Sequence, residues 1–289
     1  MIGAQLTSYC QAQGWQALEG VVETAIKDVY FYRSAQGNPR QPFVYQSSIV
    51  ILGQGHKTLY FGDHAVAYGP DNYLVVGMPV PLECEAFASE DKPLLGLGIN
   101  IDPQRLRRIV SQLDATGYRH PNTDSPTCVR SVGMETPLTA VCLRIIAALS
   151  NPQDAAILGD ALVDELLYRV LTGHEGPVLF ELARQEGTYA RVAKALTKVH
   201  AEYHDTLTVQ GLADEANMSV SAFHHAFRSV TMESPLQYIK KVRLTKAKEL
   251  IQLEGLRVND AARQVGYTSP SQFSREYRRH FNETPRGKR

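Results

Sequence analysis

The last third of this 289-residue chain contains one short pattern twice. The first copy reads SVSAFHHAFR from Ser219, and the second reads SPSQFSREYR from Ser269, 50 residues later. Each copy follows a short run with small apolar residues and a tight turn, and the second turn is one residue longer. A short helix, a tight turn and a second helix form a helix-turn-helix motif. The repeat therefore predicts two such motifs in an all-helical C-terminal domain.

The second helix of each predicted motif has a capping signal and an apolar side. Ser269-Pro270-Ser271-Gln272 has the spacing of a capping box with proline at the first helical position, and Ser219 can cap the first copy. The apolar side consists of Phe223, Ala226, Phe227 and Val230 in the first helix, and of Phe273, Tyr277 and Phe281 in the second. We expect these side chains to form core, which determines which face of each helix points outward.

The side chains opposite the apolar stripes are suited to DNA. They are Ser221, His224, His225 and Arg228 in the first helix, and Ser271, Gln272, Arg275, Arg278 and Arg279 in the second. An α-helix fits the major groove, where Arg pairs with guanine, Gln pairs with adenine, and His or Ser can supplement them. Arg228 and Arg278 flank these rows and suit phosphate contacts. The pattern predicts double-stranded DNA as a partner.

Charge is distributed unevenly along the chain. From Tyr189 to Arg289, Lys and Arg outnumber Asp and Glu by 17 to 10, whereas the preceding residues contain 13 and 20, so +7 and −7 give the formal net charge of zero. A single helix with a polar outer face is usually only solvated. Two similarly capped copies in a basic third favour a polyanionic partner.

A long helix is predicted between the two copies, over residues 235–253. Its apolar residues cover enough surface to pack against both motifs; they are Tyr238, Ile239, Val242, Leu244, Ala247, Leu250 and Ile251. We expect this helix to act as a strut that sets the separation of the two reading helices. To enter one face of DNA, those helices must lie one turn apart, about 34 Å.

The N-terminal part has a different pattern. Up to about residue 101 the sequence predicts short strands separated by Gly, Pro, Asn and Asp. This pattern is typical of a sandwich or barrel. Helical spacing follows Asp102-Pro103 and continues over residues 137–150 and 154–172. The last two helices either form a dimer surface or pack onto the strands. No apolar run is long enough to cross a membrane, and no signal-peptide pattern opens the chain.

The C-terminal third resembles the AraC/XylS family of bacterial transcription regulators. The segments that carry the resemblance are LADEANMSVSAFHHAFRSVTMESPLQYIKKVRLTKAKELI from Leu212 and AARQVGYTSPSQFSREYRRHFNETP from Ala261. Tyr277 stands where the family more often has Phe. Residues 42–103 resemble, less specifically, the N-terminal domain of an AraC-type subgroup.

The resemblance implies an α+β chain of two domains. Residues 1–180 would form a cupin-like β-barrel with appended helices that receives an effector and supports dimerisation. Residues 181–289 would form the double helix-turn-helix domain. The family's base readers fall at Ser221, His224 and His225 in the first motif and at Ser271, Gln272 and Arg275 in the second, which are among the positions selected above from helix geometry.

A cupin-like domain can also be an enzyme. Catalytic metal sites need three or four N/O ligands, whereas His56 and His64 are isolated and no His-x-His pair occurs. No catalytic constellation, metal site or cofactor motif is evident. Acidic neighbours should raise the pKa of the Cys84 thiol, which makes it a poor redox sensor. Cys142 is predicted to pack in the apolar core. If an effector binds, Tyr45, Tyr60, Tyr73 and Phe87 are candidate pocket residues, although each is more simply explained as core.

The sequence thus predicts a cytoplasmic, sequence-specific DNA-binding transcription regulator that is not an enzyme. Its expected partners are promoter DNA, a small-molecule effector, a second copy of the chain and, if it activates transcription, RNA polymerase. Four cysteines without a CxxC pair fit a reducing compartment. Two alternatives remain open at this point: a cupin-like enzyme with an accessory DNA-binding domain, and a protein-interaction adaptor with a vestigial one.

Overall fold

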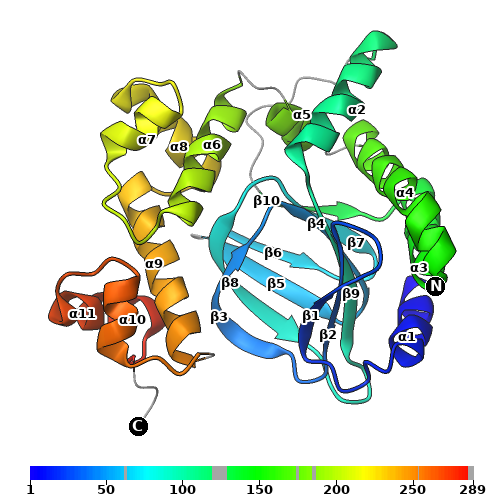
Figure 1. Cartoon of the computed structure of the whole chain (residues 1–289), viewed down its shortest axis with the longest axis horizontal. Helices are drawn as coiled ribbons and strands as arrows, with labels where there is room; N and C mark the ends of the chain where they lie inside the picture. The colour runs from blue at the N-terminus through cyan, green and yellow to red at the C-terminus, as the bar shows by residue number, and fades with distance from the viewer. Residues whose placement is uncertain (62–63, 119–128, 174–175, 184–186, 253, 286–289) are drawn as a thin grey trace.

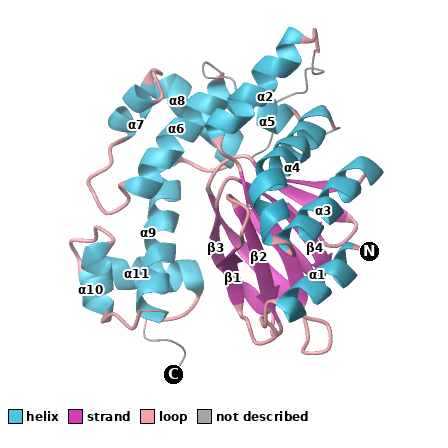
Figure 2. Cartoon of the chain, turned by 45° about the vertical axis from the view of Figure 1, so that its right-hand side comes forward, coloured by secondary structure: helices cyan, strands magenta, loops and turns pink. Residues whose placement is uncertain are grey.

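The computed structural model describes residues 1–61, 64–118, 129–173, 176–183, 187–252 and 254–285. A strand-rich N-terminal part with flanking helices is followed by an all-helical C-terminal part (Figures 1 and 2). The strands are β1 (Gly20–Glu23), β2 (Val29–Ser34), β3 (Asn38–Tyr45), β4 (Ser48–Gln54), β5 (His56–Phe61), β6 (His64–Tyr68), β7 (Asn72–Val76), β8 (Val80–Phe87), β9 (Leu94–Asn100) and β10 (Val129–Gly133). The helices of the N-terminal part are α1 (Ile2–Ala12), α2 (Pro103–Ala115), α3 (Thr136–Leu149), α4 (Pro152–Thr172) and α5 (Pro177–Ala183). Those of the C-terminal part are α6 (Thr188–Ala201), α7 (Val209–Glu215), α8 (Val220–Thr231), α9 (Pro235–Gln252), α10 (Val258–Gln264) and α11 (Pro270–Phe281).

The strands form two facing antiparallel sheets. One has the order β1-β2-β9-β4-β7-β10 and the other β3-β8-β5-β6. Among the described strands no ladder joins the two sheets, so the expected barrel is not closed. The α+β architecture predicted from the sequence is confirmed.

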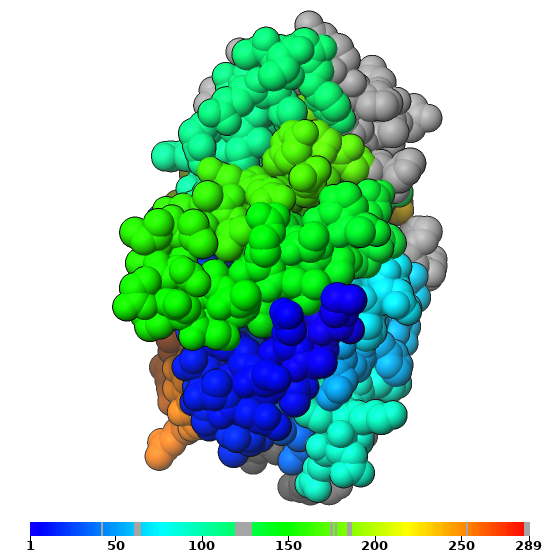
Figure 3. Space-filling model, turned by 90° about the vertical axis from the view of Figure 1, so that its right-hand side faces the viewer, coloured from blue at the N-terminus to red at the C-terminus, as the bar shows by residue number. Residues whose placement is uncertain are grey.

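Helices cover the outer face of the six-stranded sheet. Phe31 on β2 stacks on Trp15 and meets the edge of Tyr9 from α1, with ring centroids 5.4 and 5.6 Å apart. Helices α1, α3 and α4 lie together on this side of the molecule (Figure 3). The side chains that alternate with Phe31 along β2 therefore point the other way, toward the four-stranded sheet.

Two expectations for the N-terminal part need correction. Residues 21–32 are rich in Val, Ile, Tyr and Phe, a pattern that predicts one strand. They form a hairpin instead, because the chain turns between β1 and β2 with Asp28 at φ 65°. Helix α1 lies in a segment for which no element was expected, and its Leu6 is fully buried against the sheet. No helix in the described part of the chain is long and apolar enough to cross a membrane.

The apolar residues of α9 divide between two cores. Tyr238, Ile239 and Val242 belong to a core that extends from the N-terminal sheets through α6, α7 and α8. Leu244, Ala247 and Leu250 of the same helix belong to a second core with α10 and α11. The strut predicted from the sequence is present between the motifs (Figure 1). Since the first core continues past residue 180, burial marks no boundary there, and the domain limits at 180 and 181 stay a prediction.

A chain of hydrogen bonds connects α9 with the N-terminal part. The Tyr238 hydroxyl donates to the Pro79 carbonyl at 2.5 Å, and the His200 ring nitrogen Nε2 lies 2.7 Å from the same hydroxyl. Because Tyr238 has one hydroxyl proton, His200 must be the donor in its bond. Burial, with a contribution from nearby Lys246, lowers the pKa of His200 to about 4.

This buried histidine predicts a loss of stability in acid. The unfolded chain protonates His200 below its ordinary pKa of about 6.5, whereas the folded chain resists protonation down to about 4. The free energy of unfolding should therefore fall between these pH values, by on the order of 2 kcal/mol. His200→Gln keeps a donor for Tyr238 and should flatten this pH dependence in urea titrations, whereas His204→Gln, an exposed control, should not. An identical pH dependence in wild type and His200→Gln would contradict the assignment.

Candidate nucleic-acid interface

The two helix-turn-helix motifs begin their second helices in the same way. The Ser219 hydroxyl accepts from the Ala222 backbone N–H at 3.3 Å, and the Ser269 hydroxyl accepts from the Gln272 N–H at 3.3 Å. These bonds satisfy N–H groups that have no partner inside the helix. The sequence pattern predicts helices over residues 219–230 and 270–281. Helix α11 has these limits, and α8 is displaced by one residue.

The turns within the motifs are also equivalent. Asn217 in the first and Gly266 in the second take a left-handed backbone conformation, with φ of 51° and 86°. The next N–H in each turn, of Met218 or Tyr267, donates to a carbonyl of the preceding helix at 2.9 Å. Thr268 has no counterpart in the first motif, which accounts for the longer second turn.

The aromatic stripes pack inward as predicted. Phe223, Phe227 and Phe273 are fully buried, Tyr277 is nearly so, and Phe281 is half-buried. Their burial leaves the opposite side of α8 and α11 free for contact with a partner. Each buried aromatic ring should contribute roughly 1.5–3 kcal/mol to holding its helix in place.

All nine side chains that the sequence places opposite the apolar stripes are exposed. They are Ser221, His224, His225 and Arg228 on α8, and Ser271, Gln272, Arg275, Arg278 and Arg279 on α11. The two sets are not fully equivalent in the repeat. Ser221, His225 and Arg228 match Ser271, Arg275 and Arg278, but His224 matches Ser274, and Gln272 matches Ala222. The two helices therefore present different polar rows, which predicts different base preferences.

Glu276 connects the reading helix α11 to the rest of the second motif. Its carboxylate accepts from the Tyr267 hydroxyl at 2.8 Å and lies 3.3 Å from the ammonium group of Lys240 on α9. The same carboxylate accepts from the Gln272 side chain at 3.3 Å. A base contact by Gln272 must compete with, or be oriented by, this bond.

A second set of contacts fixes the first motif to the second. Arg243 of α9 donates to the backbone carbonyls of Tyr203 at 2.6 Å and Asp205 at 2.7 Å, in the loop before α7. The turn of the second motif packs closely against the same loop. A Cβ atom added to Gly266 would lie only 2.5 Å from the His204 carbonyl oxygen. Glycine is required there by both this approach and the φ angle.

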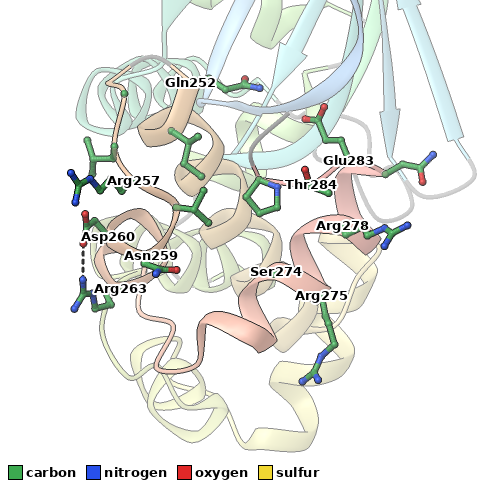
Figure 4. A pocket seen from close by; sticks show the side chains of 16 residues that line it. Gln252, Arg257, Asn259, Asp260, Arg263, Ser274, Arg275, Arg278, Glu283 and Thr284 are labelled. Carbon is green, nitrogen blue, oxygen red and sulfur yellow. Dashed lines mark hydrogen bonds and ion pairs between the residues drawn. The ribbon is translucent and has the colours of Figure 1, made fainter. Parts of the chain in front are cut away.

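An open groove lies between α10, the end of α9 and α11 (Figure 4). Arg275 and Arg278 line this groove from α11. Arg263 lines it from α10, and Arg257 lines it from the position directly before α10. Arg263 forms an ion pair with Asp260 at 2.6 Å, while the other three arginines form no ion pair within the described residues. Arg257 is a cation that the repeat pattern alone did not identify, because its proximity to α11 depends on the folded second motif.

The expected effector-pocket residues are not brought together. Tyr45 lies between the sheets and is buried. Tyr60 bonds Glu85 on the opposite face of the four-stranded sheet, where Phe87 is exposed and stacks on His56 at 4.4 Å. Tyr73 shares the helix-covered face of the other sheet with Ile51. Strand alternation therefore places the four candidates on different faces of the sheets. Only Tyr45 faces the space between the sheets, where an effector could bind.

The histidines and cysteines of the N-terminal part form no metal site among the described residues. His56 lies on the outer surface, and the side chain of His64 falls outside the described set, as does Cys128. Burial raises the pKa of the Cys84 thiol, and burial raises that of Cys142 to about 12. Cys142 is packed as predicted. The pKa of Cys84 is raised mainly by burial rather than by its acidic neighbours, on which the sequence prediction was based.

The comparisons with known proteins agree with this geometry. The family described as "AraC-type transcriptional regulator N-terminus" matches residues 25–178, more than half of the chain. The chain belongs to the AraC family. A "Helix-turn-helix domain" family matches residues 212–289, which include the second motif and most of the first motif of this AraC-family regulator.

Individual relatives are transcription regulators. The chain is 26% identical to the regulator ExsA of Pseudomonas aeruginosa over 240 residues, which cover 83% of this chain and 84% of ExsA. It is 35% identical to the regulator AlkR of Acinetobacter baylyi over 98 residues, 34% of this chain and only 32% of AlkR. The relatives support a DNA-binding regulator of transcription, and they give no support to the enzyme alternative.

Solved structures of ToxT from Vibrio cholerae share the fold. One covers 89% of this chain and 96% of ToxT, with a TM-score of 0.58 at 11% identity, and is described as bound to (E)-4-(8-methylnaphthalen-1-yl)but-3-enoic acid. Another, with a TM-score of 0.55 and covering 89% and 92% of the two chains at 11% identity, is described as bound to an unsaturated fatty acid. At this identity the likeness concerns the fold.

Arg275→Ala tests base reading by α11. We expect a loss of about 1–3 kcal/mol on the preferred site and relaxed specificity at one base pair, because a guanidinium can read guanine through two hydrogen bonds. Fluorescence anisotropy on that site and its single-base variants measures both effects. Arg263→Ala removes the same charge and should leave the base preference intact. An equal loss on every sequence after Arg275→Ala would contradict base reading.

Arg278→Ala tests a phosphate contact. Binding should weaken alike on all sequences, and the slope of log K against log salt should decrease in magnitude by about 1, because one fewer phosphate is neutralised. Arg144→Ala, on the remote helix α3, is the control for the change in net charge. An unchanged slope in Arg278→Ala is the result that removes the phosphate role.

Proposed function

We propose that this regulator reads two successive major-groove segments of promoter DNA with α8 and α11. Ser221, His224 and His225 read bases in the first segment. Ser271, Gln272 and Arg275 read the second, and Arg228 and Arg278 hold phosphates beside them.

One observation carries this proposal. Both second helices expose their polar face while their aromatic face is buried, and α9 holds the two motifs together through two cores. Arg228, Arg275 and Arg278 form no ion pair within the described residues, so these cations are available for phosphates and bases. A merely solvated surface does not require two such faces joined by one strut.

We also propose that the N-terminal part receives a small-molecule effector that shifts how the two motifs are presented to DNA. Membership of the AraC family and the bound acids in the two ToxT structures support this role. The hydrogen bond from Tyr238 to Pro79 provides a contact through which the N-terminal part can influence α9. We place this regulatory function in the cytoplasm, where promoter DNA is accessible.

A second copy of the chain and RNA polymerase are further proposed partners. Helix α4 buries one face but leaves Ile157 78% and Leu158 47% exposed on the other. Apolar side chains exposed on one helix suit contact with a second copy. Sedimentation at the concentrations used for DNA binding distinguishes monomer from dimer. Contact with polymerase would follow only if the protein activates transcription.

A gel-shift experiment with the upstream region of the protein's own gene tests the proposed function. The full chain should shift this DNA at low salt and resist competition by a scrambled fragment of equal length, since sequence-specific binding typically exceeds non-specific binding by about a thousandfold or more. If a specific fragment is found neither there nor by selection from random DNA, the adaptor alternative is favoured.

A further inference from the structure

The space between the two sheets is open above Gly98 of β9. A Cβ built on Gly98 of β9 would have no other atom within 4 Å. Gly98 pairs with Tyr30 on one side and Val50 on the other, and both of these side chains are partly exposed. These residues alternate with Phe31, which faces the helices, so they point into the space between the sheets. We call this space the inter-sheet hollow.

A lysine side chain from the opposite sheet borders the inter-sheet hollow. Lys57 of β5 pairs with Tyr68 and Ala86 and lies on the same face as the fully buried Leu59. Its ammonium group lies 4.0 Å from the ring centre of Tyr32 on β2, two residues from Tyr30 along the same face. Lys57 therefore reaches from one sheet to the other beside the hollow.

Lys57 has no carboxylate partner. No ion pair or hydrogen bond to its ammonium group occurs among the described residues. The inner face of the four-stranded sheet presents no Asp or Glu within the same set, and Glu23 of β1, which shares the face of Tyr30 on the facing sheet, is exposed and forms no ion pair with Lys57. The acids of β8, Glu83 and Glu85, alternate with the buried Cys84 and point to the outer face. Burial lowers the pKa of Lys57, which shows how poorly the protein alone compensates this charge.

The other polar groups beside Lys57 on the four-stranded sheet are neutral. The Tyr45 and Tyr68 hydroxyls lie 2.9 Å apart, and the Cys84 sulfur lies 3.8 Å from that of Tyr45. Burial raises the pKa of both tyrosines, so neither supplies a negative charge to Lys57 at neutral pH. A partly buried cation without a paired counter-charge is less stable than one that an anion completes.

We propose that the inter-sheet hollow binds a small organic acid whose carboxylate pairs with Lys57 and whose apolar body fills the space above Gly98. The polar end of the inter-sheet hollow is formed by the Lys57 ammonium group and tyrosine hydroxyls. The remaining walls, from Tyr30, Tyr32 and Val50, suit a hydrocarbon or aromatic body. This proposal rests on the proposed effector role of the N-terminal part and specifies the chemical class of the effector.

The test uses the full-length protein, without DNA, and two series of probes. Straight-chain monocarboxylates of increasing length and 4-phenylbutyrate are titrated by calorimetry, beside the alcohols of the same carbon skeleton and alkyl phosphates. We expect at least one carboxylate to bind, and its alcohol to bind about tenfold or more weakly, because a hydrogen bond to a charged group is lost. Failure of every carboxylate to bind, equal binding of acid and alcohol, or preference for the phosphates would overturn the proposal.

The variant Lys57→Met separates ligand binding from structural support. Met keeps an apolar side chain but removes the charge, so carboxylate affinity should fall to that of the alcohol, while Lys27→Met, on the exposed turn before β2, should bind like wild type. Without ligand, Lys57→Met should melt at the same or a higher temperature than wild type, because a partly buried cation without an ion-pair partner is gone. A lower melting temperature with unchanged carboxylate affinity would assign Lys57 to structure alone.

These results are independent of the DNA experiments. If Lys57→Met binds the promoter fragment like wild type in the absence of acid but no longer binds carboxylates, both proposals stand. If the wild-type chain binds carboxylates through Lys57 but shifts no DNA specifically, the ligand site stands and the proposed function fails.

Discussion

The placement of α9 in two cores is the constraint on which the DNA-binding part depends. One end of this helix is packed with the first motif and the sheets, and the other end is packed with the second motif. Arg243 adds hydrogen bonds to the loop before α7, and Gly266 allows the second turn to approach that same loop. Rotation of one reading helix relative to the other would break both sets of contacts, so the motifs form one unit.

The four-stranded sheet relates the N-terminal part to that unit. Its inner face presents Lys57 and Cys84 toward the other sheet, and its outer side meets α9, which lies against β3 and β8. The Tyr238 hydroxyl bonds the Pro79 carbonyl just before β8 begins. A ligand between the sheets would thus be separated from α9 by the thickness of one sheet. An effector that binds more tightly when β8 is in one of two positions would favour that position, and with it one arrangement of α9 and the two motifs.

Much of the DNA-binding part was predictable because its signals are local. Serine caps and aromatic residues at helical spacing were enough to predict where α11 begins and which side of α8 is exposed. Contacts across the chain were not predictable. The proximity of Arg257 to α11, the contact of Gly266 with the His204 carbonyl, and the orientation of Tyr60 and Phe87 away from the hollow all depend on strand register or on packing between distant segments.

The separation of the two reading helices is the most direct test of the account, and hydroxyl-radical footprinting on a selected high-affinity site measures it. Because α9 holds both motifs as one unit, the account predicts two protected segments on one face of the duplex, about 10 base pairs apart. Insertion of half a helical turn between them should abolish protection of one segment. Protection of a single segment on the original site, or of both segments after the insertion, would contradict the account.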